Sequence, residues 1–448
     1  LLEVEMQLLP HQIEDSAFLA SKAFAGCFSG MGSGKTLTAL EACRHVLELG
    51  DTVIIVGPPI SLHMWSEEFY NHLNIPTQII RSGAQAIAHG PGAVIMSYDI
   101  ATKRKEELKE LGAKVLICDE SHALKNTTAK RTKAILGRHG LCESVDHTWL
   151  LTGTPVTRWN DDIFSFICRA GADQLTDKIG KLNLDSFRLR YCVTQNKKFS
   201  KAQKFSTVVT VGNRNTTELN ELLFEGGMAV RRELKDVWEA MPPITINRLQ
   251  VRLDADAQLK EMLKGLEKKT VNEIREGMAS NEEHLATIRR KLGVAKVKHA
   301  ASEIIDRVEA GISPILVGCW HIEVIDALRG ALRAHGIAVQ SLDGSTSAEA
   351  KQGRQAAFND GSLQVLVGQI GAMGVSLNMQ GGSHIVVVEE DWSPAVMDQF
   401  YARCHRIGQK NHVHVDIFES NTKLDQAVRR ITSAKRAGQS KIMEQKYA

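Results

Sequence analysis

Short apolar runs alternate with helical periodicity over residues 1–170 of this 448-residue chain. Residues 36–49 have apolar positions at helical spacing and stop at Gly50, which is typical of a helix followed by a C-terminal glycine. Near-continuous apolar strands between helices indicate a parallel sheet that is covered on both faces. The predicted strands of this region are Ala23–Phe28, Thr52–Val56, Ala93–Ser97, Val115–Cys118 and Thr148–Leu151.

The same alternation starts again near Ile312, where a helix is predicted over Ile322–His335. The accompanying predicted strands are Pro314–Cys319, Ile337–Leu342, Val365–Val367, Ile385–Glu389 and Val413–Phe418. A charged stretch from about Asp254 to Lys298 reads as mostly helical. The predicted fold class is therefore α/β, with two parallel-sheet lobes. We expect lobe 1 over residues 1–175, a basic insertion over 176–245, a helical linker over 246–300 and lobe 2 over 301–448.

Composition argues against several classes of protein. The chain has no run of eighteen apolar residues and begins without a basic segment followed by an apolar one, so neither a membrane span nor a secretory signal is expected. No two of the eight cysteines lie within four residues, which excludes CxxC and zinc-finger spacings and fits a reducing cytosol. Without HExxH or GxSxG, a zinc-dependent or serine hydrolase is disfavoured.

The net charge of +3 is unevenly distributed. Residues 178–214 carry nine Lys or Arg, among them Lys197 and Lys198, against one acid, Asp185, and Phe199 and Phe205 are interleaved with the basic residues. Such a basic segment suits a phosphate backbone, although a solvated surface loop would have the same composition. Both interpretations stay open on charge alone.

A glycine-rich loop follows the first predicted strand and opens the first predicted helix. Its sequence departs from GxxxxGK[ST] only at Ser29, which stands in place of the first glycine. Glycines let backbone N–H groups turn toward phosphate oxygens at the positive end of the helix dipole. Lys35 is expected to reach the β- and γ-phosphates of ATP, and the Thr36 hydroxyl to bind Mg²⁺. The remaining predicted ATP-binding residues of the loop are Met31, Gly32, Ser33 and Gly34.

Two acids, Asp119 and Glu120, follow the strand Val115–Cys118. At the carboxyl end of a strand beside a phosphate loop, Asp119 is predicted to hold Mg²⁺ and Glu120 to polarise the attacking water. In the second lobe, Arg403 and Arg406 are three residues apart on a predicted helix and share one face. If they reach the γ-phosphate from the opposite lobe, they stabilise transition-state charge, a contribution of about 10³–10⁵ in rate. These residues complete the predicted catalytic set with Lys35.

Further short segments occur in a fixed order from about Leu8 to Asp425. They are Leu8–Gln12, Pro58–Leu62 with Trp65, Asp119–Asn126, Leu151–Pro155, Asp343–Ser345, Ala372–Val375 with Asn378, and His405–Gln409. This ordered set resembles the SWI/SNF-type double-stranded DNA translocases of helicase superfamily two. Between the lobes, Tyr191–Cys192, Glu218–Leu223, Met228–Val237 and Met241–Pro243 look most like the SMARCAL-type annealing-helicase branch.

The resemblance implies two RecA-like lobes that bind ATP between them, with Gln12 contacting the adenine. It also implies sequence-independent contacts to the DNA backbone, which weaken steeply with salt. The residues expected to contact DNA are Ser61, Trp65, Lys125, Thr154, Lys197, Lys198 and Ser345. Departures from the family pattern at Ser29-Gly30, Arg158, Ser376 and Ala402 remove no catalytic group but put coupling strength and DNA preference in doubt.

We therefore expect a DNA-stimulated ATP hydrolase, a monomeric motor that remodels, branch-migrates or anneals forked DNA. Its expected location is the cytoplasm or nucleoid of a bacterium or of a phage-infected cell. Two alternatives stay open. One is a helicase acting on single-stranded DNA or RNA, and the other is a nucleotide-gated DNA-binding switch whose slow hydrolysis is barely changed by DNA.

Overall fold

Seven parallel strands form the first of two large sheets in the computed structural model, which describes residues 8–59, 61–197, 206–233, 237, 241–253, 257–279, 282–373 and 377–443. In spatial order the strands are β3 (Thr77–Ile80), β4 (Gly92–Ser97), β2 (Thr52–Gly57), β5 (Val115–Asp119), β6 (His147–Leu151), β1 (Phe24–Cys27) and β9 (Ala229–Val230). The chain divides into two units, residues 1–237 with 437–448 and residues 238–436. This sheet belongs to unit 1.

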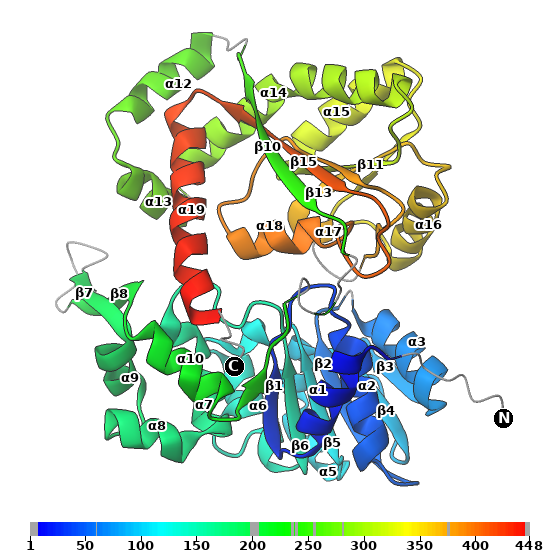
Figure 1. Ribbon diagram of the computed structural model, residues 1–448, viewed down its shortest axis with the longest axis vertical. Coiled ribbons are helices and arrows are strands. Elements are labelled where there is room, and N and C mark those ends of the chain that lie inside the picture. The colour runs from blue at the N-terminus through cyan, green and yellow to red at the C-terminus, as the bar shows by residue number, and fades with distance from the viewer. Residues whose placement is uncertain are drawn as a thin grey trace. The chain divides into compact units, whose positions relative to one another are not determined.

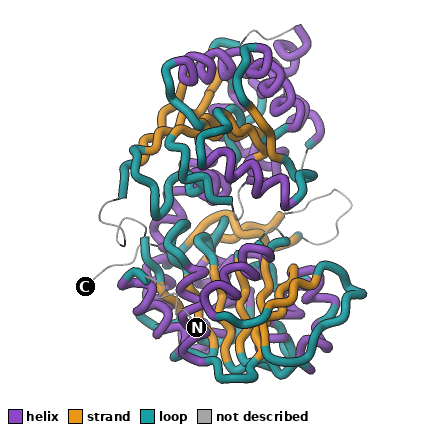
Figure 2. Tube along the Cα trace, turned by 90° about the vertical axis from the view of Figure 1, so that its right-hand side faces the viewer, coloured by secondary structure: helices purple, strands orange, loops and turns teal. Residues whose placement is uncertain are grey.

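Helices cover both faces of the unit 1 sheet (Figures 1 and 2). Successive residues of β2 point to opposite faces, so Val53 packs in one apolar cluster with Leu40 and Phe69, while Ile54 packs in the other. Both clusters are fully buried, which explains why the strands read as continuous apolar runs. The helices are α1 (Pro10–Ala20), α2 (Lys35–Val46), α3 (Leu62–Leu73), α4 (Tyr98–Lys103), α5 (Lys105–Glu110), α6 (Lys130–Leu136), α7 (Phe164–Ala170), α8 (Ala172–Ile179), α9 (Leu184–Tyr191) and α10 (Thr216–Phe224), with 3-10 turns η1 (Ser121–Leu124), η2 (Leu141–Glu143) and η3 (Asn160–Ile163).

Unit 2 contains a six-stranded parallel sheet. Its spatial order is β10 (Ile244–Val251), β15 (Val413–Ser420), β14 (His384–Val387), β11 (Ile315–Cys319), β13 (Val365–Gln369) and β12 (Val339–Leu342). Apolar clusters again fill both faces of this sheet. The helices are α12 (Ala257–Glu267), α13 (Val271–Ala279), α14 (Glu283–Glu309), α15 (Ile322–Ala334), α16 (Ala348–Asn359), α17 (Ile370–Met373), α18 (Pro394–Tyr401) and α19 (Lys423–Met443).

The predicted α/β class with two parallel-sheet lobes is confirmed, and every strand predicted from an apolar run is present within a few residues. The strands that the sequence did not reveal are β3, β9, β10 and the hairpin pair β7 and β8. β3 has four residues and β9 only two, which is too short for a clear pattern. β10 is half-exposed, because it forms an edge of the second sheet and mixes polar with apolar residues.

The basic insertion contains a separate antiparallel hairpin, β7 (Cys192–Lys197) with β8 (Thr207–Asn213), which Figure 1 shows beside α9. Acids outside residues 178–214 neutralise part of the positive charge of that segment. Arg188 donates to Asp161 at 2.8 Å, and Arg190 forms two hydrogen bonds to Glu218 at 2.8 and 2.6 Å. A count of charges along residues 178–214 therefore overstates the field of this surface.

Among the described residues, no helix combines the length and apolar character needed to cross a bilayer. All eight cysteines are free thiols.

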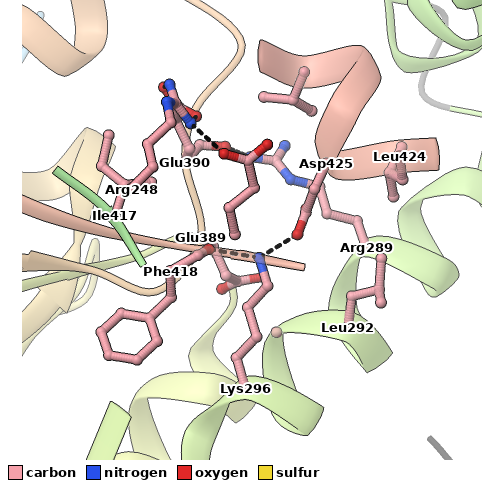
Figure 3. Close-up of a pocket in the computed structure, with 13 residues that line it drawn as sticks. Arg248, Arg289, Leu292, Lys296, Glu389, Glu390, Ile417, Phe418, Leu424 and Asp425 are labelled. Atoms are coloured by element: carbon pink, nitrogen blue, oxygen red, sulfur yellow. Dashed lines mark hydrogen bonds and ion pairs between the residues drawn. The ribbon is translucent and has the colours of Figure 1, made fainter. Parts of the chain in front are cut away.

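A buried lysine connects three elements of unit 2 (Figure 3). Lys296 of α14 is 4% exposed, and its Nζ donates to the Phe418 carbonyl of β15 at 2.9 Å. It also pairs with Asp425 of α19 at 2.7 Å, and the same carboxylate oxygen accepts from the backbone N–H of Ser420. Removing one partner of a buried ion pair leaves the other charge buried without compensation.

Substitution Lys296→Met should destabilise unit 2 by about 3 kcal/mol, because the Asp425 carboxylate, whose side chain is only 17% exposed, loses its cation. Lys291→Met on the same helix is the control, since Lys291 is only partly buried and its Nζ donates to Oε1 of Gln258. Thermal unfolding by calorimetry should show a lower midpoint for Lys296→Met and almost no change for Lys291→Met. Equal midpoints for the two variants would contradict a stabilising role for the buried pair.

Candidate active site

The loop from Ser29 to Gly34 joins β1 to α2 and turns through two left-handed residues. Gly32 has φ +79° and Gly34 has φ +84°, a region that residues with a Cβ rarely adopt. A Cβ on Gly34 would lie 2.1 Å from Nε2 of Gln12, so the position has no room for a side chain either. The turn places the first amides of α2, which have no intrahelical acceptor, at the loop. This backbone is suited to binding an anion.

Lys35 is folded back over the loop. Its Nζ donates to the carbonyl oxygens of Ser29 and Gly30, both at 2.9 Å. Burial lowers the pKa of Lys35, and the nearby carboxylates of Glu120 and Asp119 act in the opposite direction. The ammonium therefore lies among carbonyl and carboxylate oxygens, which are positions that phosphate oxygens could take over.

The first helix closes the other side of the loop. Gln12 and His11 are both buried, and their Nε2 atoms lie 3.4 and 3.0 Å from the Ser33 carbonyl oxygen. Oε1 of Gln12 accepts from the backbone N–H of Leu9, which fixes the orientation of the amide. Gln12, predicted as an adenine contact, therefore lies directly against the phosphate loop.

Asp119 ends β5 and is held by two aromatic residues that lie distant in sequence. Its Oδ2 accepts from the indole Nε1 of Trp65 at 2.9 Å, and its carbonyl accepts from the Tyr98 hydroxyl at 2.7 Å. Burial and the neighbouring Glu120 charge raise the pKa of Asp119 to about 6, while Trp65 and Lys35 favour the ionised form. A carboxyl group with a raised pKa is a candidate functional group, because a bound cation would stabilise its ionised form.

Glu120 adopts a left-handed backbone, with φ +48°, that is uncommon for a residue other than glycine. Its Oε2 lies 3.3 Å from Nδ1 of His122, and the same ring nitrogen lies 3.2 Å from Oγ1 of Thr152. Thr152 in turn accepts from the backbone N–H of Thr154 at 3.1 Å. Strained residues cluster at active sites, so this conformation supports a functional assignment of Glu120.

The donor set fits a nucleotide and a magnesium ion. The hydroxyl of Ser33 is buried in the loop without a hydrogen-bond partner among the described residues, and Lys35 Nζ donates to two backbone carbonyls that phosphate oxygens could replace. Within that part of the chain, no cluster of three or more His, Cys, Asp or Glu side chains could hold a metal. Mg²⁺ commonly uses one or two protein ligands together with substrate phosphates, and Thr36 with Asp119 would suffice.

In unit 2 the two candidate arginines differ from their neighbours. His405 and Gln409 are buried: His405 Nε2 lies 2.8 Å from the Pro242 carbonyl oxygen, and Gln409 Nε2 donates to three carbonyls. Helix α18 ends at Tyr401, so the prediction that Arg403 and Arg406 share one face of a helix is wrong. Both arginines are half-buried, and Arg403 donates to the carbonyls of Gln399 and Leu377. His405 and Gln409 therefore shape the segment that presents the arginines, a role that the sequence did not indicate.

The residues predicted to contact DNA fall into different environments. Ser61 and Trp65 are fully buried, and the indole of Trp65 donates to Asp119. Ser345 is exposed, and its N–H and hydroxyl both donate to Asp343.

The other predicted contacts lie in unit 1. Lys125 is 38% exposed and contacts Thr157 and, at 3.8 Å, Asp162. Thr154 is half-buried, and its hydroxyl has no partner among the described residues. Lys197 ends β7, whereas Lys198 lies outside the described residues.

Comparison with known proteins assigns the family. The family model of the SNF2-related domain matches residues 20–298, which is more than half of the chain, and that of the helicase conserved C-terminal domain matches residues 296–408. The chain belongs to the SNF2-related family. It is an ATP hydrolase of helicase superfamily two, and the resemblance to SWI/SNF-type ATPases is confirmed.

Relatives of this SNF2-related chain include proteins of DNA repair and chromatin. It is 26% identical over 402 residues to the SWI/SNF-related matrix-associated actin-dependent regulator of chromatin subfamily A-like protein 1 of Xenopus laevis, covering 86% of this chain and 38% of that protein. It is 25% identical over 441 residues to the human DNA annealing helicase and endonuclease ZRANB3, covering 94% of this chain and 39% of that protein. The chain thus spans less than half the length of these relatives. The Sulfolobus solfataricus SWI2/SNF2 ATPase core in complex with dsDNA is 17% identical, with a TM-score of 0.44 over 99% of this chain and 98% of that one.

These relatives overturn one prediction. A location in the cytoplasm or nucleoid of a bacterium or phage-infected cell is wrong as an inference, because the frog relative is a eukaryotic regulator of chromatin and the human relative a eukaryotic DNA annealing helicase. The length of the chain is no sign of its source, because the matched region occurs inside much longer proteins.

Substitution Gly34→Ala should weaken nucleotide binding by at least about tenfold, or ~1.4 kcal/mol, because the added Cβ requires a strained φ and displaces Gln12. Gly83→Ala is the control in the same unit, since no atom lies within 4 Å of a Cβ there. Titration with a fluorescent ADP analogue measures the difference. Equal affinity in both variants would mean that the left-handed turn is not required for binding.

Proposed function

We propose that this SNF2-related ATPase is a motor that moves along duplex DNA and remodels or anneals forked DNA. The observation that carries the proposal is the convergence of Lys35, Asp119 and Glu120 at one phosphate loop, in a chain whose residues 20–408 are matched by the two domain models. The human relative is called a DNA annealing helicase, which favours strand annealing or branch migration over simple unwinding.

The proposed chemistry is hydrolysis of the γ-phosphate of ATP. Lys35 exchanges its contacts to the Ser29 and Gly30 carbonyls for phosphate oxygens, and the first amides of α2 orient the same group. Mg²⁺ held by Thr36 and Asp119 would neutralise charge on the phosphates. Glu120 orients and polarises the attacking water, with His122 fixing its side chain from 3.3 Å.

Arg403 and Arg406 remain the proposed arginine fingers. Their segment is well anchored, because the buried Gln409 donates to the carbonyls of Gln380, Gly382 and Cys404. A rigid base limits the loss of side-chain entropy when a guanidinium engages a phosphate. Loss of either arginine should lower the rate of hydrolysis more than it lowers nucleotide affinity.

On the DNA side, the proposal relies on exposed polar groups that contact the phosphate backbone. Lys125 lies five residues after Glu120 and pairs with Asp162 at 3.8 Å. Its side chain is 38% exposed, so its ammonium is accessible to a DNA phosphate. The N–H of Ser345 is held in a turn by Asp343 after β12. Such contacts carry no sequence information and predict an affinity that falls steeply with salt.

Steady-state ATP hydrolysis with single-stranded DNA, duplex DNA, forked DNA, RNA or no nucleic acid tests this function. Duplex or forked DNA should stimulate hydrolysis, and Lys35→Ala should lower the stimulated rate at least about a hundredfold, or ~2.7 kcal/mol. Lys133→Ala removes an exposed lysine of α6 in the same unit and should leave the rate unchanged.

Stimulation by single strands or RNA alone would replace the proposal with a single-strand or RNA helicase. Slow hydrolysis that is equal under all conditions would replace it with a nucleotide-gated DNA-binding switch.

A further inference from the structure

The segment Met228–Glu233 runs beside the strand and loop that hold the candidate nucleotide site. Its carbonyls accept three hydrogen bonds in succession: Gly26 N to Met228 O at 3.1 Å, Phe28 N to Val230 O at 2.8 Å and Gly30 N to Arg232 O at 2.7 Å. The parallel pairing of β9 with β1 therefore continues past both strands into the phosphate loop. The loop backbone is supported along this edge.

Two arginines of the segment add side-chain contacts. Nη1 of Arg231 donates to the Phe28 carbonyl at 2.8 Å. Nε of Arg232 donates to Oδ1 of Asp15 at 3.0 Å, and its Nη2 donates to the exposed Glu14 at 2.8 Å.

Ser29 joins these groups into one network. Its hydroxyl accepts from the backbone N–H of Arg232 at 3.0 Å and lies 3.5 Å from Oδ2 of Asp15. Ser29 occupies the position where the common phosphate-loop pattern has a glycine, which has no hydroxyl to offer. We call Asp15, Ser29 and Arg232 the clasp.

The ionised form of Asp15 depends on the Arg232 guanidinium. The residue is 1% exposed, and burial raises the pKa of its carboxyl, while Arg232 acts in the opposite direction. A buried carboxylate is strongly unfavourable unless it is paired and hydrogen-bonded. Asp15 and Arg232 are therefore expected to act as a unit.

Helix α1 thereby holds the loop at both ends. His11 and Gln12 contact the Ser33 carbonyl at the end of the loop, and one turn later Asp15 contacts Ser29 at its start. Unit 1 passes into unit 2 between Val237 and Trp238, five residues after Arg232. Of the clasp residues, Arg232 thus lies on the stretch of chain that leads to the second unit.

We propose that Arg232 is a positioning residue for ATP binding, which acts through Asp15 and Ser29 to keep the phosphate loop in its binding conformation. The proposal rests on the proposed nucleotide site. It further states that an occupied loop tightens the hydrogen bonds of residues 229–232, so that nucleotide occupancy is transmitted to the segment that precedes the second unit.

The test uses a double-mutant cycle in the whole chain without DNA, read by titration with a fluorescent ADP analogue and Mg²⁺. Arg232→Gln and Asp15→Asn should each weaken binding about tenfold, and the double variant should be no weaker than either single one. Ser29→Ala should weaken binding about threefold, because it removes only the hydroxyl. Arg232→Lys should restore part of the affinity, since it keeps the charge but not the fork that reaches Asp15 and Glu14.

Arg169→Gln is the matched control. Arg169 pairs with Glu143 at 2.7 Å and is 24% exposed, against 25% for Arg232, but it belongs to α7 and contacts none of the residues assigned to the site. Unfolding midpoints of the nucleotide-free variants identify any that fail to fold. A structural role alone would lower these midpoints and leave the affinity of the folded fraction unchanged, which would overturn the proposal.

The variant Lys35→Ala distinguishes failure of the clasp proposal from failure of the nucleotide-site assignment. If Lys35→Ala abolishes binding while the clasp variants bind normally, the clasp proposal fails and the nucleotide site stands. If Lys35→Ala binds normally, the assignment of the nucleotide site fails.

Hydrogen exchange gives a second readout besides affinity. The analogue with Mg²⁺ should slow exchange of the backbone amides of Gly30 and Arg232, whose hydrogen bonds join the loop to this segment, and the effect at Arg232 should be smaller in Ser29→Ala. Unchanged exchange in this segment at saturating nucleotide would overturn the claim that occupancy is transmitted.

Discussion

The path of the backbone from β1 into α2 is the constraint on which the site depends. Gly32 and Gly34 take left-handed conformations, and the space above Gly34 is already filled by Gln12, so the turn accepts no other residue without strain. Three neighbouring groups contact this turn. Lys35 donates to its carbonyls, His11 of α1 contacts the Ser33 carbonyl, and the residues that follow β9 accept from Gly30. A loop fixed from several sides presents its amides without having to order itself when a phosphate arrives.

Charge is concentrated at the loop at a cost to stability. Lys35 is buried beside two carboxylates, the pKa of Asp119 is raised to about 6, and Glu120 has a strained backbone. A buried charge and a strained backbone each cost free energy that an apolar or solvent-exposed side chain with ordinary backbone angles would not. Their collection at the carboxyl ends of parallel strands is understandable if a polyphosphate and a cation complete the charge balance there. The remote residues Trp65 and Tyr98 keep the aspartate in one orientation.

Sequence reasoning succeeded where one local pattern carried the information. The buried strands are continuous apolar runs, and Lys35, Asp119 and Glu120 stand at fixed positions after such strands, so fold class and core site were predictable. Contacts between distant residues were not: Trp65 reaches Asp119 across 54 positions, and Arg232 reaches Asp15 across 217. For the same reason the positive charge of residues 178–214 was overestimated from the sequence. Asp161 and Glu218, which neutralise two of its arginines, lie outside this segment.

The central claim is that ATP hydrolysis at this loop drives movement along intact duplex DNA. Displacement of a third strand from a DNA triplex measures such movement without requiring the duplex to open. The protein should release the third strand only with hydrolysable ATP, leave the two duplex strands paired, and lose this activity in Lys35→Ala. Separation of the duplex strands, or DNA-stimulated hydrolysis without any release of the third strand, would contradict it.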